Sequence, residues 1–272
     1  MTLNCDLVGM IIEERLAEVS QGQGGLACVS FNRCLATAAR PTLSPSQRMT
    51  SDSPRQIPLG AVHFGDLKRL SPIGRDFGYD RGTPVDRYYI ESFLARHAVD
   101  IRGRVLELAN NEYTRRFGGV RVEQSDVLSL KADNPNATIV GDLAVAGTLP
   151  VAAFDCIIFT QALQYIYDLH AAMAMLHRAL RSDGVLLATV PGVTQVDVWP
   201  WYWSFTEASL QRLLADQFGA INVVAEGHGN VFAATTLLYG IAVQELSTAD
   251  LDVNDPAYPV TIAARAVKRA VI

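Results

Sequence analysis

The sequence predicts an α/β protein with a doubly wound, mostly parallel seven-stranded sheet and helices on both faces. From Arg104 onward, short apolar runs alternate with amphipathic segments, a pattern typical of strands joined by right-handed helical crossovers. In addition, the apolar run 105–108 passes directly into a helix-compatible segment. A strand that turns sharply into a helix usually places a nucleotide-like ligand beyond its carboxyl end.

The helices and strands are predicted from the spacing of apolar residues and from the residues that bound each apolar run. Runs bounded by Gly, Pro, Asn or Asp predict strands, and apolar residues at helical spacing predict helices. The expected strands cover residues 105–108, 120–124, 138–141, 154–159, 185–190, 221–226 and 260–267. The expected helices in this part of the chain cover about residues 112–117, 161–180 and 206–217.

Three segments are expected along the chain. Residues 1–60 are rich in Ser, Thr, Pro and Gly, which predicts a poorly ordered extension. Residues 61–103 contain a glycine-containing loop and an apolar helical pattern after Pro84, which predicts a lid loop and a leading helix. Residues 104–272 form the expected α/β domain.

Composition excludes several classes of function. A net charge of -5 without a Lys/Arg cluster argues against a nucleic-acid binder. The four cysteines have neither the spacing of a zinc site nor the density of a disulfide scaffold. The first residues lack a basic leader, and no apolar segment reaches the roughly 18 residues of a membrane span. We therefore expect a cytoplasmic protein that contacts neither membrane nor nucleic acid.

Three acids lie at or after successive expected strands. Glu107 lies near the end of the first strand, Asp126 follows 19 residues later, and Asp142 follows the third strand. An acid about 20 residues on can accept hydrogen bonds from ribose hydroxyls, and an acid after the third strand can accept from an adenine amine. Each acid alone is compatible with a solvated loop, but together they favour a nucleoside site.

The turn after the first strand contains no glycine. A phosphate-binding fingerprint needs glycines so that the backbone can approach a pyrophosphate, and Ala109, Asn110 and Asn111 supply none. NAD and FAD are therefore disfavoured. Asn tolerates a left-handed backbone, so a tight turn carrying side-chain amides is expected, with a simple strand-to-helix connection as the alternative.

Residues 104–268 resemble the class I S-adenosylmethionine-dependent methyltransferases. The residues that carry the resemblance are VLEL at 105–108, Asp126, GDL at 141–143, FDCII at 154–158 and LRSDGVLL at 180–187. More narrowly, YTRRFGG at 113–119 with QALQYIYD at 161–168 is similar to a bacterial subgroup associated with glycosyltransferases. The resemblance implies a Rossmann-like methyltransferase fold and S-adenosylmethionine as cofactor.

The resemblance also implies roles for individual residues. Glu107 would lie near the methionine amino group, and Asp126 would hold the ribose hydroxyls. Asp142 and Leu143 would frame the adenine, while Gln161 would face the methionine moiety or the acceptor. The complete implied cofactor-binding set is Glu107, Ala109, Asn110, Asn111, Asp126, Gly141, Asp142, Leu143 and Gln161.

Acceptor contacts and a general base are less determined. The aromatic run at 198–207 follows the fifth strand, and aromatic faces suit sugar rings or planar acceptors. Trp201 and Tyr202 are the expected acceptor contacts, with a core or lid anchor as the alternative. His228 between two glycines is the candidate catalytic base, with an exposed loop histidine as the alternative. No metal is expected, because the remaining acids are scattered.

The sequence therefore predicts an S-adenosylmethionine-dependent methyltransferase, with a saccharide or small secondary-metabolite oxygen as acceptor and direct displacement as mechanism. The glycine-free turn leaves a second hypothesis open, a catalytically silent relative that assembles with a biosynthetic enzyme. Non-methylating chemistry on the same fold is a third. The apolar segments at 171–176 and 231–240 leave a homodimer open.

Overall fold

The computed structural model describes residues 57–196 and 200–270. The chain divides into two compact units, whose described parts are residues 57–70 and the part from Ser71 onward. Residues 57–70 contain a short 3-10 helix, η2 (Gly65–Leu67). Of the expected N-terminal extension, residues 1–56 lie outside the described residues.

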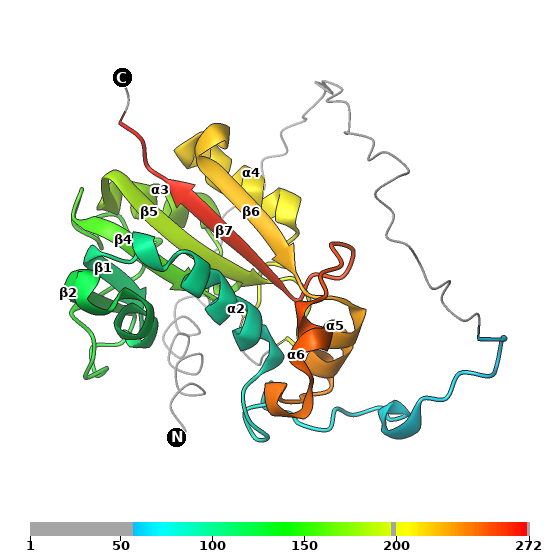
Figure 1. The fold of residues 1–272 in the computed structure, drawn as a ribbon. Helices are drawn as coiled ribbons and strands as arrows, with labels where there is room; N and C mark the ends of the chain where they lie inside the picture. The colour runs from blue at the N-terminus through cyan, green and yellow to red at the C-terminus, as the bar shows by residue number, and fades with distance from the viewer. Residues whose placement is uncertain (1–56, 197–199, 271–272) are drawn as a thin grey trace, which may run out of the picture. The chain divides into compact units, whose positions relative to one another are not determined.

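The second unit contains a seven-stranded sheet flanked by helices (Figure 1). Its strands are β1 (Gly103–Leu108), β2 (Val122–Ser129), β3 (Ile139–Val140), β4 (Phe154–Thr160), β5 (Leu180–Pro191), β6 (Val223–His228) and β7 (Thr261–Val267). Its α-helices are α2 (Val85–Arg96), α3 (Leu169–Ala179), α4 (Glu207–Phe218), α5 (Val231–Leu238) and α6 (Thr248–Asp252). A π-helix, η4 (Thr114–Gly118), follows β1, and the 3-10 helices are η3 (Ala98–Asp100), η5 (Gly119–Arg121), η6 (Leu163–Tyr165), η7 (Ala220–Asn222) and η8 (Val243–Glu245).

The strand order is β3-β2-β1-β4-β5-β7-β6. Strands β1 to β5 pair in parallel, while β7 is antiparallel to both β5 and β6. Because β7 runs opposite to its neighbours, β6 points the same way as β5. The predicted fold class, a mostly parallel doubly wound sheet, is confirmed.

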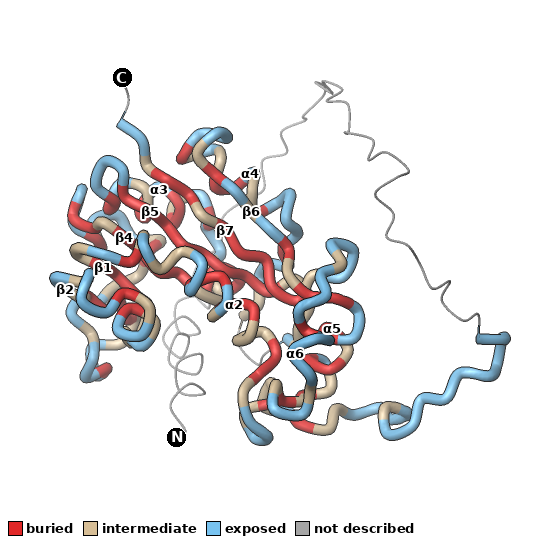
Figure 2. Tube along the Cα trace, in the orientation of Figure 1, coloured by how far each residue is buried: buried red, intermediate tan, exposed pale blue. Residues whose placement is uncertain are grey.

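Alternate residues of the central strands face opposite layers, as a strand period of two requires. Ile157 and Leu186 belong to the core under α3 and α4, whereas Ile158 and Leu187 belong to the core under α2. Figure 1 shows α2 crossing one face of the sheet, with α3 and α4 behind it. Both faces are therefore covered, and the buried residues run along β4, β5 and β7 (Figure 2).

Among the elements whose bounds differ from the prediction, two matter for the site. Strand β2 continues to Ser129 instead of ending at residue 124, because Val127 and Leu128 are buried and pair with the end of β1. The helix predicted over 161–180 starts only at Leu169, where the Asp168 side chain accepts a hydrogen bond from Ala171 N and caps it. These shifts decide which side chains stand at the sheet edge.

Candidate functional site

A cavity opens at the carboxyl edge of the sheet, where parallel strands of an α/β fold usually bind ligands. Its walls come from four strand ends and the segments that follow them, residues 107–110 after β1, 128–130 after β2, 141–143 after β3 and 159–162 after β4. Arg87 of α2 and Tyr165 of η6 complete the lining used below. Four strands far apart in sequence thus meet at one hollow.

The turn after β1 is held in a strained conformation. Ala109 has a φ of 62°, in the left-handed region that costs a non-glycine residue about 1 kcal/mol or more. Its N–H donates to Leu128 O at 2.8 Å, and its carbonyl accepts from Asn134 Nδ2 at 2.8 Å. Asn110 N donates to Leu108 O at 2.7 Å. These bonds fix the turn without glycine.

Glu107 lies under this turn and is only 4% exposed. Its Oε1 accepts from Tyr113 N at 3.2 Å, and its Oε2 accepts from both Thr114 N and Thr114 Oγ1 at 2.7 Å. Burial raises the pKa of Glu107 to about 7, although the hydrogen bonds from Thr114 and Tyr113 favour its charged form. The carboxylate therefore titrates near neutrality and would be stabilised by a cationic ligand.

Gly141 and Asp142 shape the wall after β3. A Cβ at Gly141 would lie 2.7 Å from Thr148 Cγ2, so this position needs glycine. Asp142 Oδ1 accepts from Ala144 N at 2.8 Å, and Thr148 Oγ1 donates to Asp142 O at 2.6 Å. The loop is thus closed on itself, with Asp142 and the buried Leu143 lining the cavity.

Gln161 presents an unpartnered donor. Its φ of 52° is left-handed, and its N–H donates to Thr189 O at 2.8 Å. The side-chain Nε2 is buried and has no hydrogen-bond partner within the described residues. Buried polar groups without partners are uncommon, and this residue lines the cavity. A ligand atom that accepts a hydrogen bond would satisfy it.

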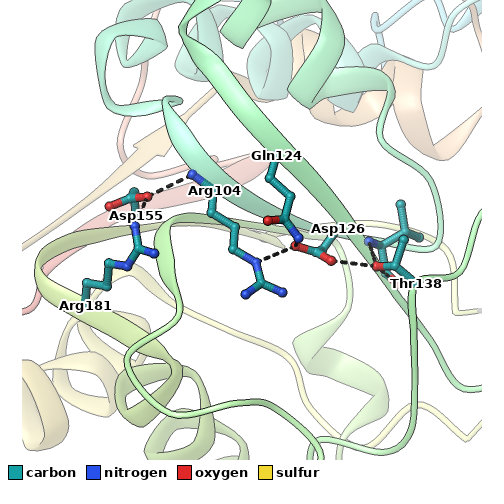
Figure 3. A network of polar contacts seen from close by, with 7 residues as sticks. Arg104, Gln124, Asp126, Thr138, Asp155 and Arg181 are labelled. Atoms are coloured by element: carbon teal, nitrogen blue, oxygen red, sulfur yellow. Dashed lines mark hydrogen bonds and ion pairs between the residues drawn. The ribbon is translucent and has the colours of Figure 1, made fainter.

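Asp126 is not part of this lining, contrary to the expectation for the ribose site. Because β2 extends to Ser129, Asp126 lies inside the strand opposite Leu106. Arg104 Nε donates to its Oδ2 at 2.7 Å and Thr138 Oγ1 donates to its Oδ1 at 3.0 Å, as Figure 3 shows. The true end of β2 instead brings Ser129 and Leu130 to the cavity.

Asn111 also lies outside the lining, since its Nδ2 donates to Ser125 Oγ at 3.0 Å. Seven members of the expected cofactor-binding set do line the one cavity: Glu107, Ala109, Asn110, Gly141, Asp142, Leu143 and Gln161. The structure therefore brings together two of the three predicted acids.

His228 does not lie at the cofactor cavity either. It is the last residue of β6 and lines a separate hollow with Arg96 and Glu226. Its Nε2 is 3.1 Å from Arg96 Nη2. Burial, followed by the charge of Arg96, lowers the pKa of His228. The predicted base therefore lines a different hollow from the cavity described above.

The aromatic run is attached to the cavity. The rings of Trp201 and Tyr165 are 5.2 Å apart, and Tyr202 N donates to Gln164 O at 2.9 Å. Trp203 Nε1 donates to Ile166 O at 2.8 Å. Tyr165 and Ile166 both line the cavity. Residues 198 and 199 of the expected aromatic run lie outside the described residues.

Sequence reasoning missed several lining residues. Ser129 and Leu130 would have been found if the apolar pair after Asp126 had been included in the strand. Tyr165 belongs to the motif at 161–168 but was given no role of its own, and Arg87 carried no signal, because only tertiary packing brings α2 to the sheet edge. Among the described residues, no group of three or more His, Cys, Asp or Glu side chains is arranged to hold a metal.

One family model matches more than half of the chain. A family described as a methyltransferase domain matches residues 67–238. A solved S-adenosylmethionine-dependent methyltransferase from Archaeoglobus fulgidus is 12% identical, with a TM-score of 0.47, over 67% of this chain and 94% of that one. Another from Mesorhizobium loti is 15% identical, with a TM-score of 0.43, over 70% of this chain and 100% of that one. No curated protein matches significantly. Searching the described helices, we find none that is both apolar and long enough to cross a membrane.

The lining fits the chemistry of S-adenosylmethionine, which carries a nucleoside, a sulfonium, an amine and a carboxylate. Glu107 and Asp142 offer carboxylates toward cationic or N–H groups, Arg87 offers a cation, and Gln161 Nε2 offers a free donor. The strand ends supply the apolar walls that a small-molecule site needs. The chain therefore belongs to the methyltransferase-domain family, and S-adenosylmethionine is its cofactor.

Proposed function

We propose that the protein transfers the methyl group of S-adenosylmethionine to an oxygen of a saccharide or of a small secondary-metabolite acceptor. The observation that carries this proposal is the attachment of the aromatic run to the cavity wall, through the Trp201–Tyr165 ring contact and the Trp203–Ile166 hydrogen bond. Aromatic faces offer apolar area to sugar rings, and Tyr and Trp keep polar tips for hydroxyls. The similarity of residues 113–119 and 161–168 to glycosyltransferase-associated proteins supports the same acceptor class.

The cofactor would lie along the sheet edge. Asp142 and Leu143 would hold the adenine, and Ser129 at the end of β2 would take the place at the ribose that was expected of Asp126. Glu107 would lie near the methionine amine, and Gln161 would face the methionine moiety or the acceptor. Each of these residues lines the cavity.

The cofactor supplies an electrophilic methyl group on sulfur. The residues of this chain would contribute by holding an acceptor oxygen in line with that methyl group and by excluding water. Orientation of this kind can account for about 7–11 kcal/mol of a barrier. Trp201 and Tyr202 are the proposed orienting contacts, because one touches Tyr165 and the other is bonded to the η6 backbone.

Calorimetry and product mass test the proposal. In calorimetry, binding of S-adenosylmethionine and of S-adenosylhomocysteine should each give a measurable heat. In mass spectrometry of a panel of free and O-blocked saccharides, only those with a free hydroxyl should gain the mass of one methyl group. Trp201→Ala should raise the KM for the acceptor and leave the affinity for S-adenosylhomocysteine unchanged. Tyr258→Ala, an exposed aromatic outside the cavity lining, is the matched control. Absence of heat with both nucleosides at millimolar concentration would reject the proposal.

A catalytically silent partner protein is the second candidate, and the glycine-free turn favours it. The orientation of Asn111 toward Ser125 argues the other way, because its amide then leaves the cavity open. A silent relative would bind the nucleosides weakly or not at all and would copurify with a biosynthetic enzyme. Measurable methyl transfer to any acceptor would exclude it.

A further inference from the structure

Arg87 is a charged residue of the cavity wall to which the proposed placement of the cofactor gives no specific contact. It lies in the first turn of α2 and is the one positively charged residue among the described residues that line the cavity. Its Nε donates to Tyr79 Oη at 3.0 Å, and its Nη1 donates to Tyr113 Oη at 3.1 Å. No acceptor is bonded to Nη2 within the described part of the chain. The guanidinium is therefore fixed on one side and open on the other.

Burial opposes the charged form of Arg87, but Asp86 and the hydroxyls of Tyr113 and Tyr79 outweigh it, so its pKa lies above the ordinary value. A cation at the cavity wall would also attract an anionic group of a ligand, in addition to the adjacent Asp86. Of the groups on S-adenosylmethionine, the carboxylate alone is negative. Arginine also binds carboxylates with paired N–H donors.

The turn after β1 has few backbone donors left for this role. Five of its N–H groups already have protein acceptors, those of Ala109, Asn110, Glu112, Tyr113 and Thr114. In a glycine-rich turn such groups can face a bound anion. Here the hydrogen bonds that fix the glycine-free turn occupy five of the six N–H groups of residues 109–114, so the anionic end of the ligand would gain from a donor on another element.

The order of the strands places that donor at the correct end. Asp142 follows β3, the edge strand, whereas α2 packs on the core formed by β1, β4, β5 and β7. A nucleoside with its adenine at Asp142 and its sulfur beyond β1 therefore extends its amino-acid end toward α2. Arg87 reaches the cavity from this side.

We propose that Arg87 binds the carboxylate of the cofactor's methionine moiety, held in place by the hydroxyls of Tyr79 and Tyr113. Arg87 is thus the residue that replaces the missing backbone donors of the turn. The inference rests on the placement of the cofactor described under the proposed function.

The test compares S-adenosylmethionine with its decarboxylated analogue, which keeps the nucleoside, the sulfonium and the amine. By calorimetry the wild-type protein should prefer S-adenosylmethionine. Arg87→Met should lower the affinity for S-adenosylmethionine by about 10- to 100-fold, as expected for hydrogen bonds to a charged group, and change the affinity for the analogue by less than about three-fold. Tyr113→Phe removes the hydroxyl that accepts from Arg87 Nη1. It should lower the affinity for S-adenosylmethionine by a smaller factor and leave the affinity for the decarboxylated analogue unchanged.

Arg116→Met is the matched control, because Arg116 forms an ion pair with Glu91 of α2 and does not line the cavity. It should bind both ligands as the wild type does. Binding of the analogue also reports whether the Arg87 variant is folded. Equal losses for both ligands in Arg87→Met would show a structural role and overturn the proposal. If the wild-type protein bound neither ligand, the placement of the cofactor in this cavity would fall with it.

Discussion

The carboxylate of Glu107 accepts hydrogen bonds from both the backbone N–H and the hydroxyl of Thr114, each at 2.7 Å. Thr114 is fully buried and Glu107 nearly so. The pair joins the end of β1 to the first turn of η4 and so fixes the wall of the cofactor cavity on that side. Losing one donor would leave a desolvated charge less compensated, which is costly.

Thr114→Val should destabilise the protein in a pH-dependent way. It removes the hydroxyl and keeps the branched shape, so the unfolding free energy should fall by about 2 kcal/mol near pH 8, where Glu107 is charged. Near pH 5 the raised pKa leaves Glu107 protonated, and the loss should be about 1 kcal/mol, the value of a neutral hydrogen bond. Urea denaturation at both pH values measures the difference.

Thr114→Ser is the control for this comparison. It keeps the hydroxyl and removes one buried methyl group, so its loss should be about 1 kcal/mol and equal at both pH values. Equal losses for the valine variant at the two pH values would show that the hydroxyl does not interact with a charged Glu107.

Glu107 should also make stability depend on pH. Its pKa is about 7 in the folded protein and 4.5 ordinarily, so the folded state holds the proton more tightly. This contribution is fully present below about pH 4.5 and is lost as the pH rises through about 7. The difference between the folded and the ordinary pKa corresponds to about 3 kcal/mol of unfolding free energy. The stability of wild type minus that of Glu107→Gln should therefore fall by about this amount between pH 4.5 and 8, measured by urea denaturation.

Exposed Glu123 in β2 provides the comparison for the pH effect. Glu123→Gln removes a carboxylate that is not buried, and its difference from wild type should change by much less than that of Glu107→Gln over the same range. A flat profile for Glu107→Gln as well would mean that Glu107 is ionised throughout in the folded protein.

Much of the fold could be predicted because its signals are local. Apolar runs such as residues 154–159 and the cap at Thr206 identify strands and helices from a few neighbours, and the structure confirms both. The end of β2 could not be placed, because the polar residues Ser125 and Asp126 were interpreted as a loop after the predicted strand 120–124. Pairing with β1 carries the strand through these polar residues.

The site was predicted where strand ends alone determine it. Glu107 and Asp142 follow directly from the ends of β1 and β3, and both line the cavity. Asp126 was predicted to follow β2, but the strand continues through it to Ser129, and Asp126 therefore does not line the cavity. Arg87 could not be predicted, because nothing in the sequence of α2 indicates which side of the sheet the helix covers.

Asp126 should now act on stability and not on cofactor affinity. Asp126→Asn removes the charge that Arg104 approaches at 2.7 Å, in a site only 4% exposed. Because hydrogen bonds between charged groups contribute about 1.5–3 kcal/mol, the unfolding free energy should fall by about 2 kcal/mol. Affinity for S-adenosylhomocysteine, measured by calorimetry, should stay within two-fold or so. A tenfold loss of affinity with unchanged stability would return Asp126 to the ribose site.

Ala109 should tolerate glycine better than it tolerates a branched side chain. At a φ of 62°, Ala109→Gly relieves about 1 kcal/mol of strain and loses a similar amount through the freer unfolded chain. Ala109→Val should cost about 2 kcal/mol, because a β-branched residue is strained in this region. Ala146, exposed in a loop and without positive φ, should show the opposite order, with glycine the less stable variant. If urea denaturation gave the same order at both positions, the left-handed turn would not be the cause.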